Sequence, residues 1–242
     1  MSITRKKYIC RLIGRILVLM ASIAAWFVTP ESFEILDGMN FFKSFSPFHI
    51  LWVLWVIDML QQIIPIRNKL PLGSMKLFSN RFRPIRDRIN YQALREYVVS
   101  TTKSAYQIFL IWVVGILILG MLYWNGIIGK PLLFLLSVAF YVCDLICVLI
   151  WCPFRLFMRT RCCTTCRIFN WDHLMMFAHL SLIGGFYATS LVVIALAAWL
   201  VWEICIMMYP ERFWDKSNQA LKCCECTDKL CTQYCQKLRS KK

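Results

Sequence analysis

The chain has 242 residues, of which 59% are apolar and 17% are charged, whereas soluble proteins have about 45–50% apolar and about 25% charged residues. This balance excludes a soluble globule, a collagen, a coiled-coil array and a disordered chain, because the apolar residues fall in runs long enough to cross a bilayer. Lys and Arg number 28 against 13 Asp and Glu, a formal charge of +15. In a membrane protein such an excess first predicts topology.

Six apolar segments predict an all-α integral membrane protein, a bundle of about six transmembrane helices. We expect the crossings at about residues 12–29, 49–66, 107–125, 131–152, 169–187 and 190–209. The last two come from one apolar stretch, Leu174 to Tyr209, which is too long for a single crossing. We place a tight turn at Gly184-Gly185 because these are the least helix-favouring residues near its middle.

The distribution of basic residues predicts the orientation of this bundle. With six crossings, Lys43 and Lys130 are the only two of the 28 Lys and Arg on the far side, and both termini share the other side. The positive-inside rule makes that side the cytoplasm, as in a plasma (inner) membrane protein. The first segment is expected to stay uncleaved, because Trp26 and Phe27 are bulky where a signal-peptide cleavage site needs small residues.

Two hydrophilic segments accompany the six-crossing bundle of residues 1–209. The loop at 67–106 carries Arg81, Arg83, Arg86 and Arg88, and its functional interpretation is contact with anionic lipid headgroups. The alternative is a loop whose charge only keeps it in the cytoplasm. No nucleic-acid-binding motif accompanies the charge, so we expect no nucleic-acid partner. A homo-oligomer or a membrane partner subunit stays open. The second segment, 210–242, is a basic, Cys-rich tail.

The thirteen cysteines are the strongest chemical signal. Two Cys-x-x-Cys pairs, Cys163 with Cys166 and Cys223 with Cys226, fall in the 161–167 turn and in the tail. Two such turns supply four thiolates to a tetrahedral metal ion, and the membrane hairpin between them returns both to one surface. The sequence therefore predicts a small cytoplasmic four-cysteine metal site, with Zn²⁺ favoured. Further candidate ligands are Cys162, Cys224, Cys231, Cys235 and His173.

Other uses of these thiols remain open. An iron–sulfur cluster is the alternative cofactor, although neither segment has the cysteine spacing of bacterial or of plant-type ferredoxins. Soft thiolates also suit Cu(I). Disulfides are disfavoured by a reducing cytoplasm, and S-palmitoylation is typical of cysteines beside spans and basic residues. The cysteines outside the two segments, Cys10, Cys143, Cys147, Cys152 and Cys205, are interpreted as packing residues.

Ionisable side chains inside the apolar segments are the second signal. Asp58, Asp144 and Glu203 lie at a similar expected depth, and even lenient scales put the cost of an Asp at mid-membrane at about 2.5 to 3.5 kcal/mol. We expect these carboxylates to form one polar site, with Arg15 as counter-ion and His179 as a further candidate. The alternative is interhelical hydrogen bonding that only fixes the helix register.

Three function classes follow from these signals. The first is a polytopic membrane protein whose four-cysteine metal site staples the bundle around the intramembrane polar site. The second is a membrane redox protein whose iron–sulfur or dithiol centre passes electrons to a lipid-soluble acceptor. The third is an ion- or proton-coupled transporter that uses the buried carboxylates. The sequence carries none of the common hydrolase, kinase or P-loop motifs, so the assignment leans away from an enzyme.

Overall fold

The computed structural model describes residues 3–43, 45–64, 76–85, 89–158 and 166–222. Within these ranges the chain is all-helical and has no strand, although one isolated antiparallel bridge joins Pro84 to Asn218. Four of the described helices are long and apolar enough to cross a membrane: α1 (Ile3–Val28), α3 (Tyr91–Trp124), α4 (Lys130–Leu149) and α7 (Gly185–Met208). These helices indicate an integral membrane protein.

The remaining helices are shorter. The apolar helix α2 (Phe48–Ile63) has 16 residues, and α5 (Phe154–Met158) and α6 (Asp172–Phe177) have one to two turns. Short 3₁₀ helices connect or extend them: η1 (Pro30–Leu36), η2 (Asn40–Phe42), η4 (Ser79–Arg81), η6 (Ile168–Asn170), η7 (Ala178–Leu182), η8 (Pro210–Phe213) and η9 (Gln219–Leu221).

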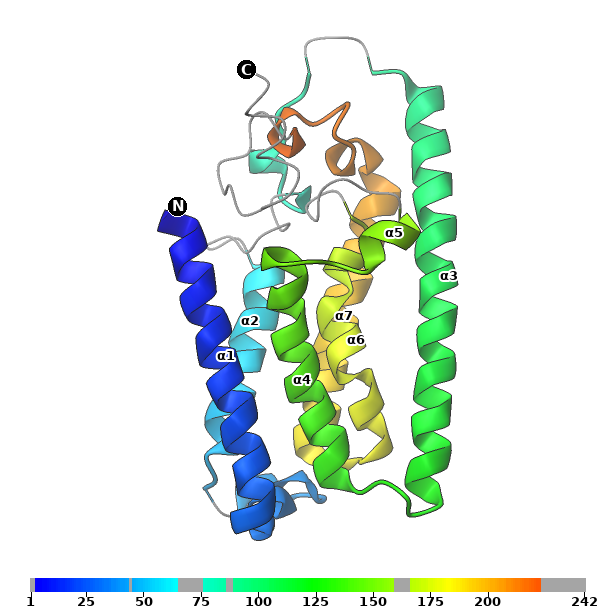
Figure 1. The fold of residues 1–242 in the computed structure, drawn as a ribbon. Helices are drawn as coiled ribbons and strands as arrows, with labels where there is room; N and C mark the ends of the chain where they lie inside the picture. The colour runs from blue at the N-terminus through cyan, green and yellow to red at the C-terminus, as the bar shows by residue number, and fades with distance from the viewer. Residues whose placement is uncertain (1–2, 44, 65–75, 86–88, 159–165, 223–242) are drawn as a thin grey trace.

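The helices pack as an elongated bundle, shown in Figure 1. α1 runs along α4, and α2 runs along α7. α3 stands at the opposite edge from α1 and contacts α5, η7 and η8. The central core joins η1 to the main helices through buried aromatic side chains, among them Phe33, Trp55, Phe134, Phe177 and Tyr187. α1 therefore has one neighbouring long helix, whereas α4 lies inside the bundle.

Local sequence explains several helix ends. The side chain of Asn90 caps α3 by accepting a 3.1 Å hydrogen bond from the Ala93 amide. At its other end, Gly126 has φ +71°, and the Ile127 amide bonds to the Leu122 carbonyl at 3.0 Å, as expected for a glycine C-cap. Pro131 occupies the first turn of α4, where its missing N–H costs no helical hydrogen bond.

The observed helices differ from the expected crossings at several ends: α1 begins at Ile3, nine residues before the expected 12, and further differences concern α3, the 169–187 segment and α7. α3 is one continuous helix from residue 91, so the crossing expected at 107–125 extends back into the loop expected at 67–106. The segment expected at 169–187 is not one helix, because α6 gives way to η7 at Ala178. α7 begins at Gly185, five residues before the expected 190.

The turn expected at Gly184-Gly185 lies at that position. Both residues have positive φ, +71° and +76°, a backbone conformation that favours glycine. The Phe186 amide donates a 2.8 Å hydrogen bond to the Gly38 carbonyl, so the turn packs against the connection between α1 and α2. This contact joins the start of α7 to the α1–α2 connection at the end of the bundle that lies opposite to the start of α1.

Candidate functional site

Three of the sequence-predicted polar residues meet a tyrosine between α1, α2 and α4, in a group we call the arginine–aspartate cluster: Arg15, Asp58, Asp144 and Tyr141. An Arg15 amino group donates a 2.9 Å hydrogen bond to Asp144, and the guanidinium lies 3.8 Å from Asp58. The Tyr141 hydroxyl donates to Asp58 at 3.1 Å. One guanidinium thus faces two carboxylates from two other helices.

Tyr141 also holds the arginine directly. The Arg15 guanidinium carbon lies 3.6 Å from the centre of the Tyr141 ring, and Arg15 donates a 2.6 Å hydrogen bond to the Tyr141 carbonyl. A guanidinium stacked on an aromatic ring and bonded on its edges has little freedom to turn away. Sequence reasoning did not identify Tyr141. Its position three residues before Asp144, on the same helical face, is the signal that points to it.

Glu203 lies in a second cluster, apart from the two aspartates with which it was expected to form one site. Its carboxylate accepts hydrogen bonds from Arg167 at 2.5 Å and from the Trp171 indole at 2.8 Å. Arg167 also donates to the Thr102 hydroxyl on α3 at 2.9 Å. The Arg167 and Glu203 side chains are only 8% and 10% exposed. This second cluster ties α3 and α7 to the segment before α6.

The two candidate histidines have different surroundings. His179 is buried in η7, and its Nε2 lies 3.0 Å from both the Ser137 hydroxyl and the Leu133 carbonyl of α4. His173 is buried beside Asp172, with its Nδ1 3.2 Å from that carboxylate. Neither histidine belongs to the arginine–aspartate cluster. His179 links η7 to α4, in agreement with a packing role.

The predicted metal ligands fall mostly outside the described residues. These are Cys162, Cys163, Cys223, Cys224, Cys226, Cys231 and Cys235. Cys166 is described and lies buried in an apolar group with Ala105, Met158 and Trp171. Among the described residues, no three His, Cys, Asp or Glu side chains are grouped so as to hold a metal ion. The four-cysteine site therefore stays a prediction.

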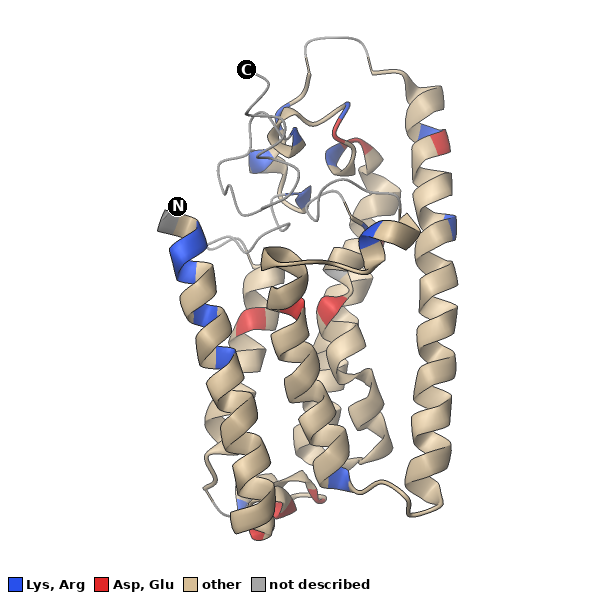
Figure 2. Ribbon diagram, viewed as in Figure 1, with Lys and Arg blue, Asp and Glu red and all other residues tan. Residues whose placement is uncertain are grey.

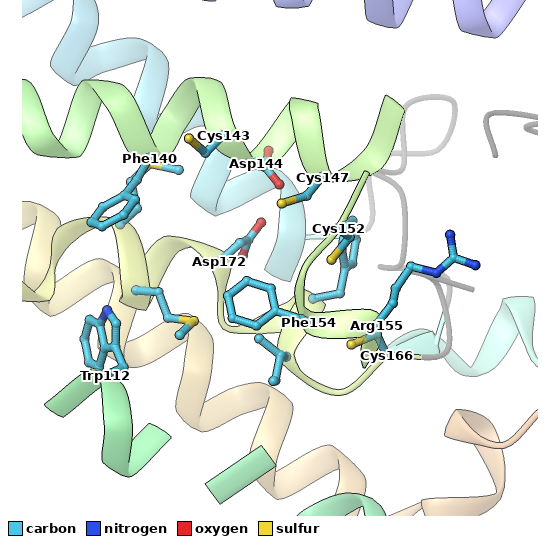
Figure 3. A pocket seen from close by; sticks show the side chains of 14 residues that line it. Trp112, Phe140, Cys143, Asp144, Cys147, Cys152, Phe154, Arg155, Cys166 and Asp172 are labelled. Atoms are coloured by element: carbon cyan, nitrogen blue, oxygen red, sulfur yellow. The ribbon is translucent and has the colours of Figure 1, made fainter. Parts of the chain in front are cut away.

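A cavity of about 140 Å³ lies beside the arginine–aspartate cluster (Figure 3). Its walls come from α3, α4, α5 and the segment of η6 and α6, and they are mostly apolar. The Asp144 and Asp172 carboxylates are part of the lining. Six of the fourteen lining residues carry sulfur: Cys143, Cys147, Cys152, Cys166, Met175 and Met176. Sequence reasoning treated the first three as packing residues and missed their common cavity.

Asp172 connects this cavity to α2. The Gln62 amide donates to Asp172 at 3.1 Å, so the start of α6 is tied to the last turn of α2. Asp172 also accepts a 2.8 Å hydrogen bond from the His173 amide. The two carboxylates that line the cavity, Asp144 and Asp172, therefore both accept hydrogen bonds from other side chains.

Fold and site together define an all-helical protein with long membrane-type helices, two ion-pair clusters inside the bundle and a thiol-lined cavity. In comparisons with known proteins, no protein-family model, no curated protein and no solved structure matches the chain. Any functional conclusion thus depends on the site itself.

Proposed function

We propose that the chain is a six-crossing membrane protein in which the arginine–aspartate cluster exchanges a proton or a small cation, as in an ion- or proton-coupled transporter. The observation that carries this proposal is the unequal number of charges, since the single Arg15 guanidinium faces both Asp58 and Asp144. With both carboxylates ionised the group has one excess negative charge. A proton or a monovalent cation restores neutrality, which favours its uptake in a low-dielectric bundle.

The proposed topology adds α2 and the broken segment at 168–182 to the four long helices. α2 is about 24 Å long at 1.5 Å per residue, somewhat less than a hydrocarbon core of about 30 Å. The charge pattern supports both additional crossings: Figure 2 shows basic residues gathered at the end of the bundle where α1 begins and α7 ends. By the positive-inside rule we assign that end, and both termini, to the cytoplasm of a plasma-type membrane.

Exchange also requires access to the cluster. The Asp58 side chain is 36% exposed in the bundle, whereas Arg15 and Asp144 are 15% and 18% exposed. Asp144 lines the cavity as well, so one carboxylate of the cluster borders an open space and the other approaches the bundle surface. The competing interpretation is a fixed set of interhelical bonds that sets the helix register. The two interpretations differ in whether a carboxylate changes its protonation state.

Infrared difference spectroscopy tests the exchange without knowledge of a substrate. We expect wild-type protein in lipid nanodiscs to show the carbonyl band of a protonated carboxylic acid that changes across the neutral pH range. Asp144→Asn and Asp58→Asn should each remove or shift this band. Asp37→Asn, which changes an exposed carboxylate paired with Lys130 at the other end of the bundle, is the matched control. A wild-type spectrum without such a band, or one that both variants leave unchanged, contradicts the proposal.

The metal staple is a separate proposal for the Cys-rich segments. One Zn²⁺ held by Cys163, Cys166, Cys223 and Cys226 would tie the start of the 168–182 segment to the tail after α7. Elemental analysis of anaerobically purified protein tests it, with Cys163→Ser/Cys166→Ser as the variant and Cys10→Ser/Cys205→Ser as the control that removes equally many thiols. Zinc lost only in the first variant supports the staple. Iron with acid-labile sulfide favours the iron–sulfur form of the redox alternative. A metal-free wild type contradicts the zinc staple and the iron–sulfur centre, but not a dithiol centre.

A further inference from the structure

Two cysteines at one end of the cavity form a dithiol pair. The Cys147 and Cys152 side chains both line the cavity, and Figure 3 shows them as neighbours at its wall. Cys147 lies in the last turns of α4, and Cys152 follows the end of that helix. The chain turns back at this point, where the Trp151 amide bonds to the Ile146 carbonyl at 3.1 Å. The turn explains why thiols five residues apart converge.

The lining of the cavity indicates an apolar, ring-shaped ligand. Trp112 of α3, Phe140 of α4 and Phe154 of α5 contribute aromatic rings to its walls. The volume of about 140 Å³ is close to that of an engineered cavity of about 150 Å³ that binds benzene. A single six-membered ring is therefore the size of group that fits.

The position of the cavity indicates a ligand that arrives from the bilayer. Cys143 lines the cavity on α4 and is exposed on the outside of the bundle, and two further lining residues, Phe140 of α4 and Trp112 of α3, are half-buried. α4 is one of the long apolar helices, so this side of the bundle faces the hydrocarbon region. A ring seated in the cavity can leave its apolar tail in the lipid between α3 and α4.

We infer that the cavity binds the ring of a lipid-soluble quinone and that Cys147 and Cys152 reduce it. The two thiols give up two electrons and two protons and form one S–S bond, and the quinone takes up both electrons and both protons to become a hydroquinone. No other reactant is consumed. This site is distinct from the predicted four-cysteine metal site, and its test is independent of the ion exchange proposed for the arginine–aspartate cluster.

The experiment uses reduced full-length protein in lipid nanodiscs, without oxygen, with decylubiquinone as the probe. Hydroquinone is measured by its ultraviolet absorbance, and the disulfide is located by mass spectrometry after free thiols are alkylated. We expect equal amounts of hydroquinone and of a Cys147–Cys152 disulfide. Cys147→Ser and Cys152→Ser should each abolish this reaction, because neither variant can form the disulfide that supplies the two electrons. Cys10→Ser and Cys205→Ser, which remove thiols that do not line the cavity, should leave it unchanged.

A second variant separates ligand binding from thiol chemistry. Met175→Trp places a large side chain in the cavity and keeps both thiols. Diamide, a small soluble oxidant, should still form the Cys147–Cys152 disulfide in this variant, whereas decylubiquinone should not. The inference is overturned if the quinone leaves Cys147 and Cys152 reduced in the wild type, or if Met175→Trp reacts with the quinone at the wild-type rate.

Discussion

Arg15 of α1 donates a 2.9 Å hydrogen bond to Asp144 of α4 across 129 positions of sequence. α1 is the least buried of the four long helices, because only 6% of its most apolar 18-residue stretch is buried in the structure. Half-buried residues on one side of α1, among them Leu12, Val18 and Leu19, pack against the bundle, and in a bilayer lipid covers the other sides. The ion pair adds a directional contact to this packing, which fixes the register of α1 against α4.

The first prediction concerns removal of this arginine. Arg15→Met leaves the largely buried Asp144 carboxylate without its counter-ion, so we expect the free energy of unfolding to fall by about 3 kcal/mol. Asp144→Leu added to Arg15→Met should recover much of that loss, because the uncompensated charge is then gone. Unfolding by SDS in mixed micelles, followed by tryptophan fluorescence, measures both values.

Arg11→Met is the matched control for this prediction. Arg11 lies one turn earlier on the same helix, is exposed, and lies 5.6 Å from the Tyr8 ring. Its loss should change the free energy of unfolding by about 0.5 kcal/mol or less. Equal effects of Arg11→Met and Arg15→Met would show that positive charge on α1 matters only through the lipid headgroups.

A second ion pair, Lys130 with Asp37, should behave differently because it is accessible to water. The two side chains are 39% and 43% exposed, so solvent screens their interaction. A double-mutant cycle with Lys130→Met and Asp37→Asn should give a coupling energy of about 0.5 kcal/mol, which disappears near 1 M salt. A coupling that is large and independent of salt would mean that this end of the bundle is closed to water.

The sequence predicts the depth of the intramembrane charges better than their partners. Counting residues along each apolar segment gives the height of Asp58, Asp144 and Glu203, but it does not give the direction in which each helix faces its neighbours. Two of the three meet at Arg15, whereas Glu203 faces Arg167. Arg167 ends the 161–167 turn, which was expected to lie outside the membrane core. The ion pairs thus depend on which helices pack together, and the sequence alone does not give this packing.

The broken segment at 168–182 shows a second limit of sequence reasoning. Its composition is apolar enough for a crossing, and apolar periodicity does not distinguish an α-helix from a short α-helix followed by a 3₁₀ turn. The tertiary contacts of His179 with Ser137 and Leu133 occur in the 3₁₀ part. By contrast, the turn at Gly184-Gly185 was predictable, because adjacent glycines disfavour helix strongly.

The third prediction uses these two glycines. A Cβ at Gly185 would lie 2.4 Å from the Leu36 carbonyl oxygen and 2.9 Å from the Gly38 nitrogen, whereas a Cβ at Gly184 meets nothing within 4 Å. Both residues have positive φ, and Gly184 has φ +71° with ψ −160°, a conformation that costs an alanine about 1–3 kcal/mol. Gly184→Ala should lose about that amount of stability. Gly185→Ala should lose clearly more, because the backbone at 36–38 must move as well.

SDS unfolding of the two glycine variants checks the difference in one experiment. Hydrogen exchange at residues 36–38 adds a local readout, since the Phe186 amide bonds to the Gly38 carbonyl. We expect faster exchange there in Gly185→Ala alone. If Gly184→Ala and Gly185→Ala are equally destabilised, the close approach between the turn and the α1–α2 connection is absent in the protein.

The last prediction concerns Arg167, whose planar guanidinium bonds to two helices at once. One amino group reaches Glu203 of α7 at 2.5 Å, and the other reaches Thr102 of α3 at 2.9 Å. Arg167→Lys keeps the positive charge but has a single ammonium group in place of the fork. We expect it to keep the pair with Glu203 and to lose the bond to Thr102, at a cost of about 1.5 kcal/mol.

Hydrogen exchange should then increase in α3 around Thr102, while α7 around Glu203 stays protected. Thr102→Val, which removes the same bond from the other side, should give the same pattern. Loss of protection in α7 in either variant would mean that the two bonds do not act separately.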